Sequence, residues 1–128
     1  MTINFIECFY YFNISYITCF CLDKFAILLY KIRNKNILIP YSQNIRWFFI
    51  HFIVNLYITI YGFNDIRYSI THMLDCSEKD WTNGFQLYIA ACALHLYHIF
   101  HFNLNKMDWL HHILMALISI PITLLYNT

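Results

Sequence analysis

Long apolar stretches alternate with short polar ones along the whole chain. Four apolar blocks stand out, and they cover residues 3–22, 45–63, 82–102 and 107–126. Each block is close to the roughly 20 residues that an α-helix needs to cross the hydrocarbon core of a bilayer. None of the blocks alternates apolar and polar residues with a period of two, as membrane β-strands do. The pattern therefore predicts an all-α membrane protein with about four transmembrane helices in a bundle.

Polar segments separate these blocks. Asp23 and Lys24 follow the first block, and the apolar run after them would extend the first helix into the headgroup region. Pro40 is expected to break any helix in the linker that follows. The charged segment over residues 64–81 predicts a loop, and a short link over residues 103–106 joins the last two blocks.

Composition agrees with a membrane location. Hydrophobic residues make up 60% of the chain and charged residues 12%, whereas a soluble domain usually carries about 25% charged residues. A net charge of +1 indicates no preference for nucleic acid. Glu7 lies in the first block and no basic segment precedes it, so we expect no cleaved signal peptide. We expect an integral, multi-pass membrane protein whose partner is the lipid bilayer, and the endoplasmic reticulum would suit it.

Histidines gather where the third and fourth blocks meet. Five of the seven fall within 18 residues, and these are His95, His98, His101, His111 and His112. A histidine inside a membrane segment is costly to bury and needs a partner, so this cluster predicts a site. At helical spacing His95, His98 and His101 share one side of the third helix and could bind a metal or haem together with a histidine from another helix. Solvated histidines near the membrane interface are the simpler alternative.

Polar residues also form a stripe along the fourth block. At 100° per residue, Asp108, His112, Ser119 and Thr123 lie on one narrow face. Ser119 and Thr123 are typical of ordinary helix–helix packing. Asp108 and His112 are an ionisable pair four residues apart on the same face, and this pair indicates function more strongly.

The second block carries a comparable stripe around His51, which also includes Asn44, Asn55 and Thr59. These side chains could simply hydrogen-bond to neighbouring helices. The functional interpretation is that His51 faces the same central cavity as His112. The tryptophans have a simpler interpretation, as anchors at the membrane interface, because each stands at an end of a block: Trp47, Trp81 and Trp109.

Two short segments carry a family resemblance. Asp108-Trp-Leu-His-His-Ile-Leu resembles the double-histidine signature of the TLC-domain family, which includes the ceramide synthases. Ile45-Arg-Trp followed by Ile50-His51 resembles the helix of that family that begins with Arg/Trp and carries a histidine. The resemblance covers residues 41–126. We therefore divide the chain into an N-terminal transmembrane helix with a basic linker, residues 1–40, and a partial TLC-like transmembrane domain of three helices, residues 41–128.

This resemblance implies a membrane domain that acts in lipid metabolism or lipid binding, with an acyl lipid or acyl-CoA as substrate. Ceramide synthases transfer a fatty acyl group from acyl-CoA to the amine of a sphingoid base. When the family's motifs are placed on this sequence, His111 and His112 match the histidine pair, and His51 matches the histidine of the earlier helix. An imidazole could deprotonate the attacking amine, and a second one could orient the first or act as a nucleophile. Asp108 could fix the tautomer of the catalytic imidazole. The candidate catalytic residues are therefore His51, Asp108, His111 and His112. We expect no metal or cofactor.

The departures from the family pattern leave catalysis open. The family domain continues past the histidine pair with further acidic residues of the active site, whereas this chain ends at Thr128, so we expect a truncated or divergent domain. One alternative is a non-catalytic membrane scaffold or lipid-binding protein, and another is a histidine-rich protein that binds metal or haem. A homo-oligomer could supply missing helices. The segment from Leu94 to His98 also resembles part of the H-x-x-H-H signature of fatty-acid elongases, with Ile99 in place of the last histidine.

Overall fold

The computed structural model describes residues 4–33, 43–72 and 84–121, and these residues form helices and no strand. The all-α prediction is therefore confirmed for the described part of the chain. The elements are α1 (Phe5–Arg33), α2 (Gln43–Tyr61), α3 (Phe63–Thr71), α4 (Gly84–His101), α5 (Lys106–Ile113) and the π-helix η1 (Leu114–Ser119).

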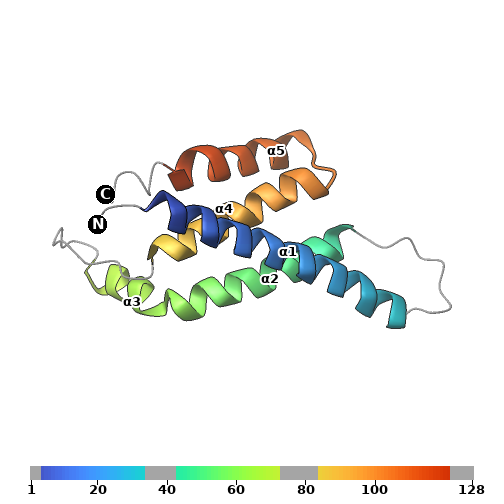
Figure 1. The fold of residues 1–128 in the computed structure, drawn as a ribbon, viewed down its shortest axis with the longest axis horizontal. Coiled ribbons are helices and arrows are strands. Elements are labelled where there is room, and N and C mark those ends of the chain that lie inside the picture. The colour runs from blue at the N-terminus through green and yellow to red at the C-terminus, as the bar shows by residue number, and fades with distance from the viewer. Residues whose placement is uncertain (1–3, 34–42, 73–83, 122–128) are drawn as a thin grey trace.

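Successive long helices run in opposite directions (Figure 1). The C-terminal end of α1, the N-terminal end of α2 and the turn from α4 to α5 lie at one end of the molecule (Figure 1). Asn105 is the N-cap of α5, and its side-chain oxygen accepts a hydrogen bond from the backbone N–H of Asp108 at 2.8 Å. The path of α5 continues without a break into η1, whose wider turns show in the hydrogen bond from the N–H of Ile120 to the carbonyl of Met115.

Part of the predicted charged loop is helical. Residues 63–71 form α3, which follows α2 after a single turn residue, Gly62. Its apolar residues Phe63, Ile66 and Ile70 recur at helical spacing between the charged ones, and a prediction based on charge alone missed this period. The remainder of that segment up to Trp81, and the end of the fourth block from residue 122, lie outside the described residues.

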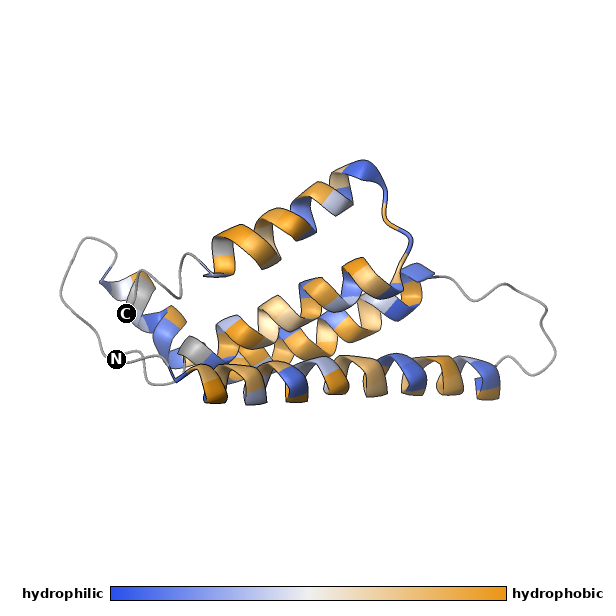
Figure 2. Cartoon of the chain, turned by 45° about the horizontal axis from the view of Figure 1, so that its top comes forward, coloured by the Kyte–Doolittle hydropathy of each residue, from blue (hydrophilic) through white to orange (hydrophobic). Residues whose placement is uncertain are grey.

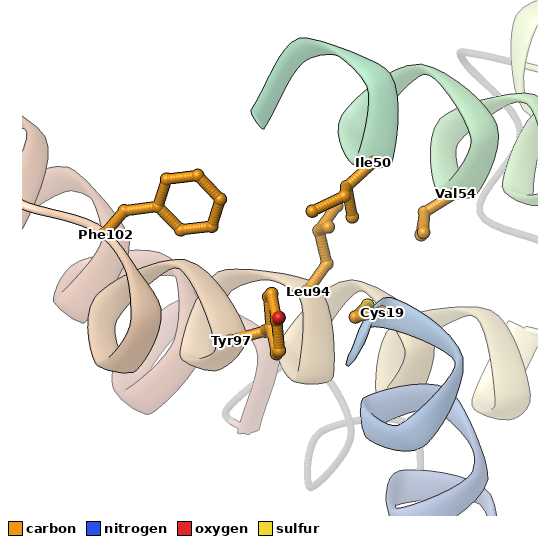
Figure 3. Packing of buried hydrophobic residues seen from close by; sticks show 6 residues of the cluster. All are labelled: Cys19, Ile50, Val54, Leu94, Tyr97 and Phe102. Atoms are coloured by element: carbon orange, nitrogen blue, oxygen red, sulfur yellow. The ribbon is translucent and has the colours of Figure 1, made fainter. Parts of the chain in front are cut away.

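Three helices share one hydrophobic core (Figure 3). Its buried side chains come from α1, α2, α4 and the residue after α4, and they are Cys19, Ile50, Val54, Leu94, Tyr97 and Phe102. Ala90 and Ala93 are also buried on α4, and such small side chains let helices approach closely. The first helix is thus part of the same packed unit as the helices of residues 41–128.

A carboxylate buried in this unit links the same three helices. Asp23 of α1 is only 1% exposed. It accepts a hydrogen bond from Nε of Arg46 on α2 at 2.6 Å and a second one from the Nη2 group of the same guanidinium. The hydroxyl of Tyr97 on α4 donates to the carboxylate at 2.8 Å. Arg46 also lies over the ring of Phe102, 4.7 Å from its centroid. The helix therefore continues past Asp23, because the charge is neutralised within the bundle.

Apolar residues predominate along the described helices (Figure 2), and many of them are exposed. Phe5 is 83% exposed, Ile6 is 79% exposed, and large apolar side chains remain exposed along α1 and α2. Among the described helices, α1 alone is both long and apolar enough to cross a membrane. Three histidines lower the mean hydropathy of α4, and Arg46, His51 and Asn55 do the same in α2.

Replacing Asp23 with alanine is expected to destabilise the fold strongly. The change leaves the partly buried Arg46 guanidinium without its counter-charge and the buried Tyr97 hydroxyl without its acceptor. Breaking a buried ion pair in this way typically costs about 3–5 kcal/mol. Thermal unfolding of the purified chain in detergent, followed by circular dichroism, measures the loss. Lys31→Ala, an exposed change on the same helix, serves as the control, and equal stability of the two variants would contradict the assigned role.

Candidate functional site

A cavity of about 300 Å³ lies between α2, α5 and the end of α4, beside the turn that joins α4 to α5. All four candidate residues from the sequence line it: His51, Asp108, His111 and His112. They come from two helices that are about 50 residues apart in the chain, so folding alone brings His51 to the others. Trp47 and His98 line the same cavity.

His112 bridges two histidines of α4. Its Nδ1 lies 2.6 Å from Nδ1 of His95, and its Nε2 lies 2.7 Å from Nδ1 of His98. The three residues are 5–8% exposed, so these hydrogen bonds satisfy ring nitrogens that water does not reach. His95 and His98 are three residues apart on α4, which places both rings on the side that faces α5.

This arrangement is a hydrogen-bonded chain and not a metal centre. Zinc–nitrogen bonds of 2.0–2.1 Å place tetrahedral ligand nitrogens roughly 3.3 Å apart, farther than the separations seen here. His112 also uses opposite ring nitrogens for its two neighbours, so the three rings do not point at one position. The described residues contain no group of three or more histidine, cysteine or acidic side chains that could hold a metal ion. The geometry of these three rings therefore gives a zinc site no support.

His101 does not belong to this group, although it shares a helix side with His95 and His98 in the sequence pattern. Its Nε2 lies 3.1 Å from the hydroxyl of Tyr16 on α1, and its ring stacks on Tyr97 with centroids 4.2 Å apart. Six residues along an α-helix turn the side chain well away from the starting direction, so His101 meets α1 while His95 meets α5.

Trp47 has a place in the site that the sequence did not reveal. Its ring stacks on His98 with centroids 3.4 Å apart and an interplanar angle of 13°. The ring of His51 meets it at 89° with centroids 4.6 Å apart, and the ring of His112 meets it at 89° with centroids 5.5 Å apart. The sequence analysis assigned Trp47 to the membrane interface and therefore missed its role in the site. The signal that could have found it is the spacing of four from His51, which puts both on one face of α2.

Asp108 does not pair with His112 as expected. Its carboxylate accepts a hydrogen bond from the side-chain amide of Asn105 at 2.6 Å, and no hydrogen bond joins it to either histidine of the pair. The side chain is exposed near the start of α5, whereas His112 turns inward to α4. His95 and His98 therefore take the orienting role that the sequence assigned to Asp108, which contributes a negative charge at the cavity.

His51 and His111 differ from His112 in what occupies their nitrogens. His111 is exposed, and its ring lies 5.2 Å from that of His112 and 5.8 Å from that of His95, centroid to centroid. His51 is half-buried, with its ring against Trp47. No described residue forms a hydrogen bond with a ring nitrogen of either one. Both ring nitrogens of these two residues are therefore open to exchange protons with a molecule bound at the cavity.

An apolar groove of about 470 Å³ runs along α2 next to the cavity. Trp47 and His51 line both hollows, so the groove and the cavity lie next to each other at these two side chains. Phe48, Phe52 and Leu56 supply most of its apolar wall. The site thus combines a polar chamber of imidazoles and amides with an apolar channel that leads away along the helix.

Comparison with known proteins found no matching family model, no similar curated protein and no similar solved structure. The likeness to the TLC-domain family therefore depends only on the sequence segments around His51, Asp108 and the histidine pair.

Chemical modification should distinguish the two histidines of the pair. Diethyl pyrocarbonate acylates accessible imidazole nitrogens, so we expect it to modify the exposed His111 well before the buried His112. Peptide mass spectrometry over a time course of the folded chain measures both rates. The exposed His72 is the positive control for reagent activity. Equal rates at His111 and His112 would show that His112 is not held as described.

Proposed function

We propose that this chain is a multi-pass membrane protein. Exposed apolar side chains along α1 and α2 support the proposal, because soluble proteins rarely present such continuous apolar surfaces to water. The helices α2 and α4 have 19 and 18 residues, which at 1.5 Å per residue gives lengths of about 27–29 Å, close to the hydrocarbon thickness of about 30 Å. Arg46 of α2 and both His95 and His98 of α4 have hydrogen-bond partners inside the bundle, as buried polar groups need in a bilayer.

Retention of the chain in membranes tests this part of the proposal. After expression, we expect the chain to stay in the membrane pellet through washing with alkaline carbonate and to enter the supernatant only with detergent. A chain held by a surface contact alone would be released by carbonate. Release of the folded chain at that step would contradict the proposal.

In that setting, we propose that the cavity handles an acyl lipid, as in the TLC-domain family. The joined cavity and groove support this, because an amphiphile needs a polar chamber for its reactive group and an apolar path for its chain. The convergence of His51, Asp108, His111 and His112 on one cavity is the observation that carries the proposal.

The proposed reaction is acyl transfer from a thioester to an amine. His111 is the proposed general base, because it faces the cavity with ring nitrogens that no described residue occupies. It would take the proton as the amine nitrogen attacks the acyl carbonyl. The new carbon–nitrogen bond forms, the carbon–sulfur bond breaks, and the proton passes from the imidazolium to the departing thiolate. His51 and Asp108 line the same cavity, where they would orient the amine for attack.

An N-acylation assay tests this reaction. The chain in lipid nanodiscs is incubated with a long-chain acyl-CoA and a long-chain amine, and the amide product is measured by mass spectrometry. We expect His111→Ala to reduce the rate by about 10²–10⁴-fold, the usual contribution of a general base. His72→Ala, outside the cavity, should keep the wild-type rate.

A folded wild-type chain that forms no amide, or an undiminished rate in His111→Ala, would refute the proposed catalysis. Labelling with a photoreactive fatty acid then tests the remaining alternative, a protein that binds lipid without catalysis. Labels on Phe48 or Phe52 without turnover would assign a lipid-binding role to the groove, and a chain with no label would lack both functions.

A further inference from the structure

The hydrogen-bonded histidines suggest a second property that does not rest on the proposed function. His95, His112 and His98, here named the imidazole chain, are joined in that order by N···N distances of 2.6 and 2.7 Å. A neutral imidazole has one N–H and one acceptor nitrogen. The central ring, His112, therefore donates to one neighbour and accepts from the other.

Two proton arrangements satisfy this chain equally well. In the first, Nδ1 of His98 donates to Nε2 of His112, and Nδ1 of His112 donates to Nδ1 of His95. In the second, both protons have crossed their hydrogen bonds, His98 has gained a proton at Nε2 and His95 has lost its Nε2 proton, so that His95 donates to His112 and His112 donates to His98. Both arrangements keep the bonds and need no backbone movement. They differ in which outer ring, His98 or His95, has an unprotonated Nε2.

The two ends of the chain lie near different parts of the site. His98 lines the cavity directly, under the ring of Trp47. His95 does not line it, but its ring lies 6.4 Å from His51 and 5.8 Å from His111, centroid to centroid. The titratable groups that face the chain are thus His51 on α2 and Asp108 and His111 on α5.

We propose that the imidazole chain is a proton relay between the His98 side of the cavity and the His51 and His111 side. A proton from the cavity binds Nε2 of His98, the Nδ1 proton of His98 passes to Nε2 of His112, and the Nδ1 proton of His112 passes to Nδ1 of His95. His95 then releases its Nε2 proton toward His51 or His111, so that one proton has crossed and the chain, still neutral, has passed from the first arrangement to the second. Buried side chains so closely coupled can pass a proton without a lasting buried charge.

Imidazole nitrogen NMR of the full chain in lipid nanodiscs, labelled with ¹⁵N-histidine, tests the relay. We expect couplings across the His95–His112 and His112–His98 hydrogen bonds. We also expect the two ring nitrogens of His112 to share an averaged position between those of protonated and unprotonated nitrogen. A hydrogen-bonded chain with a purely structural role would show the couplings but two separate His112 signals, one for each kind of nitrogen, and that result would overturn the proposal. Missing couplings would overturn it as well.

A matched pair of variants shows where the averaging originates. His98→Phe keeps an aromatic ring against Trp47 but removes the nitrogens, so the averaged His112 signals should separate into one fixed tautomer. His101→Phe makes the same substitution on the same helix outside the chain and should leave the averaging intact. Averaging that survives His98→Phe would overturn the relay. Where a variant fails to fold, the wild-type spectrum alone tests the relay. The result does not depend on whether the chain catalyses acyl transfer.

Discussion

The bond between the Asp23 carboxylate and its partners on two other helices is the constraint on which the rest of the structure depends. Removing a charge from water is expensive, so Asp23 is stable at 1% exposure only while the Arg46 guanidinium and the Tyr97 hydroxyl face it. Arg46 precedes Trp47 in the chain, and Tyr97 precedes His98. The same network therefore sets the rotation and the axial position of α2 and α4, and with them the positions of the stacked rings of Trp47 and His98.

A second polar network completes the packing at that end of the molecule. The imidazole chain fixes α5 against α4 through directional bonds, where the apolar surfaces of these helices would allow several rotations. Both ring nitrogens of His112 and the Nδ1 atoms of His95 and His98 have ring partners in place of water. This explains how so many histidines can stand in apolar helices. His51 and His111, at the edge of the chain, line the cavity with ring nitrogens that no described residue occupies.

The differences between expectation and structure have a common cause. Helical spacing correctly put Asp108 and His112 near one face of α5, but Asp108 turns to Asn105 because a carboxylate at a helix start can accept bonds from the preceding turn. Spacing also grouped His101 with His95, although α4 contacts different neighbours along its length. Trp47 was assigned to the membrane interface because its position at a block end has that simple explanation. In each case the choice of partner depends on a neighbouring helix that local sequence does not specify.

The sequence by itself determined the all-α fold class of the described residues and indicated three of the residues that line the cavity, because apolar runs, turn residues and the Asp108, His111 and His112 segment are local signals. It also indicated that His51 would belong with them. Only the tertiary structure decided the pairings, since Tyr97 and Asp23 are 74 residues apart and His95 and His112 are 17 apart. The physical reason is that helix formation depends on nearby residues, whereas the rotation of each helix is set by packing and by the need to pair every buried charge and ring nitrogen.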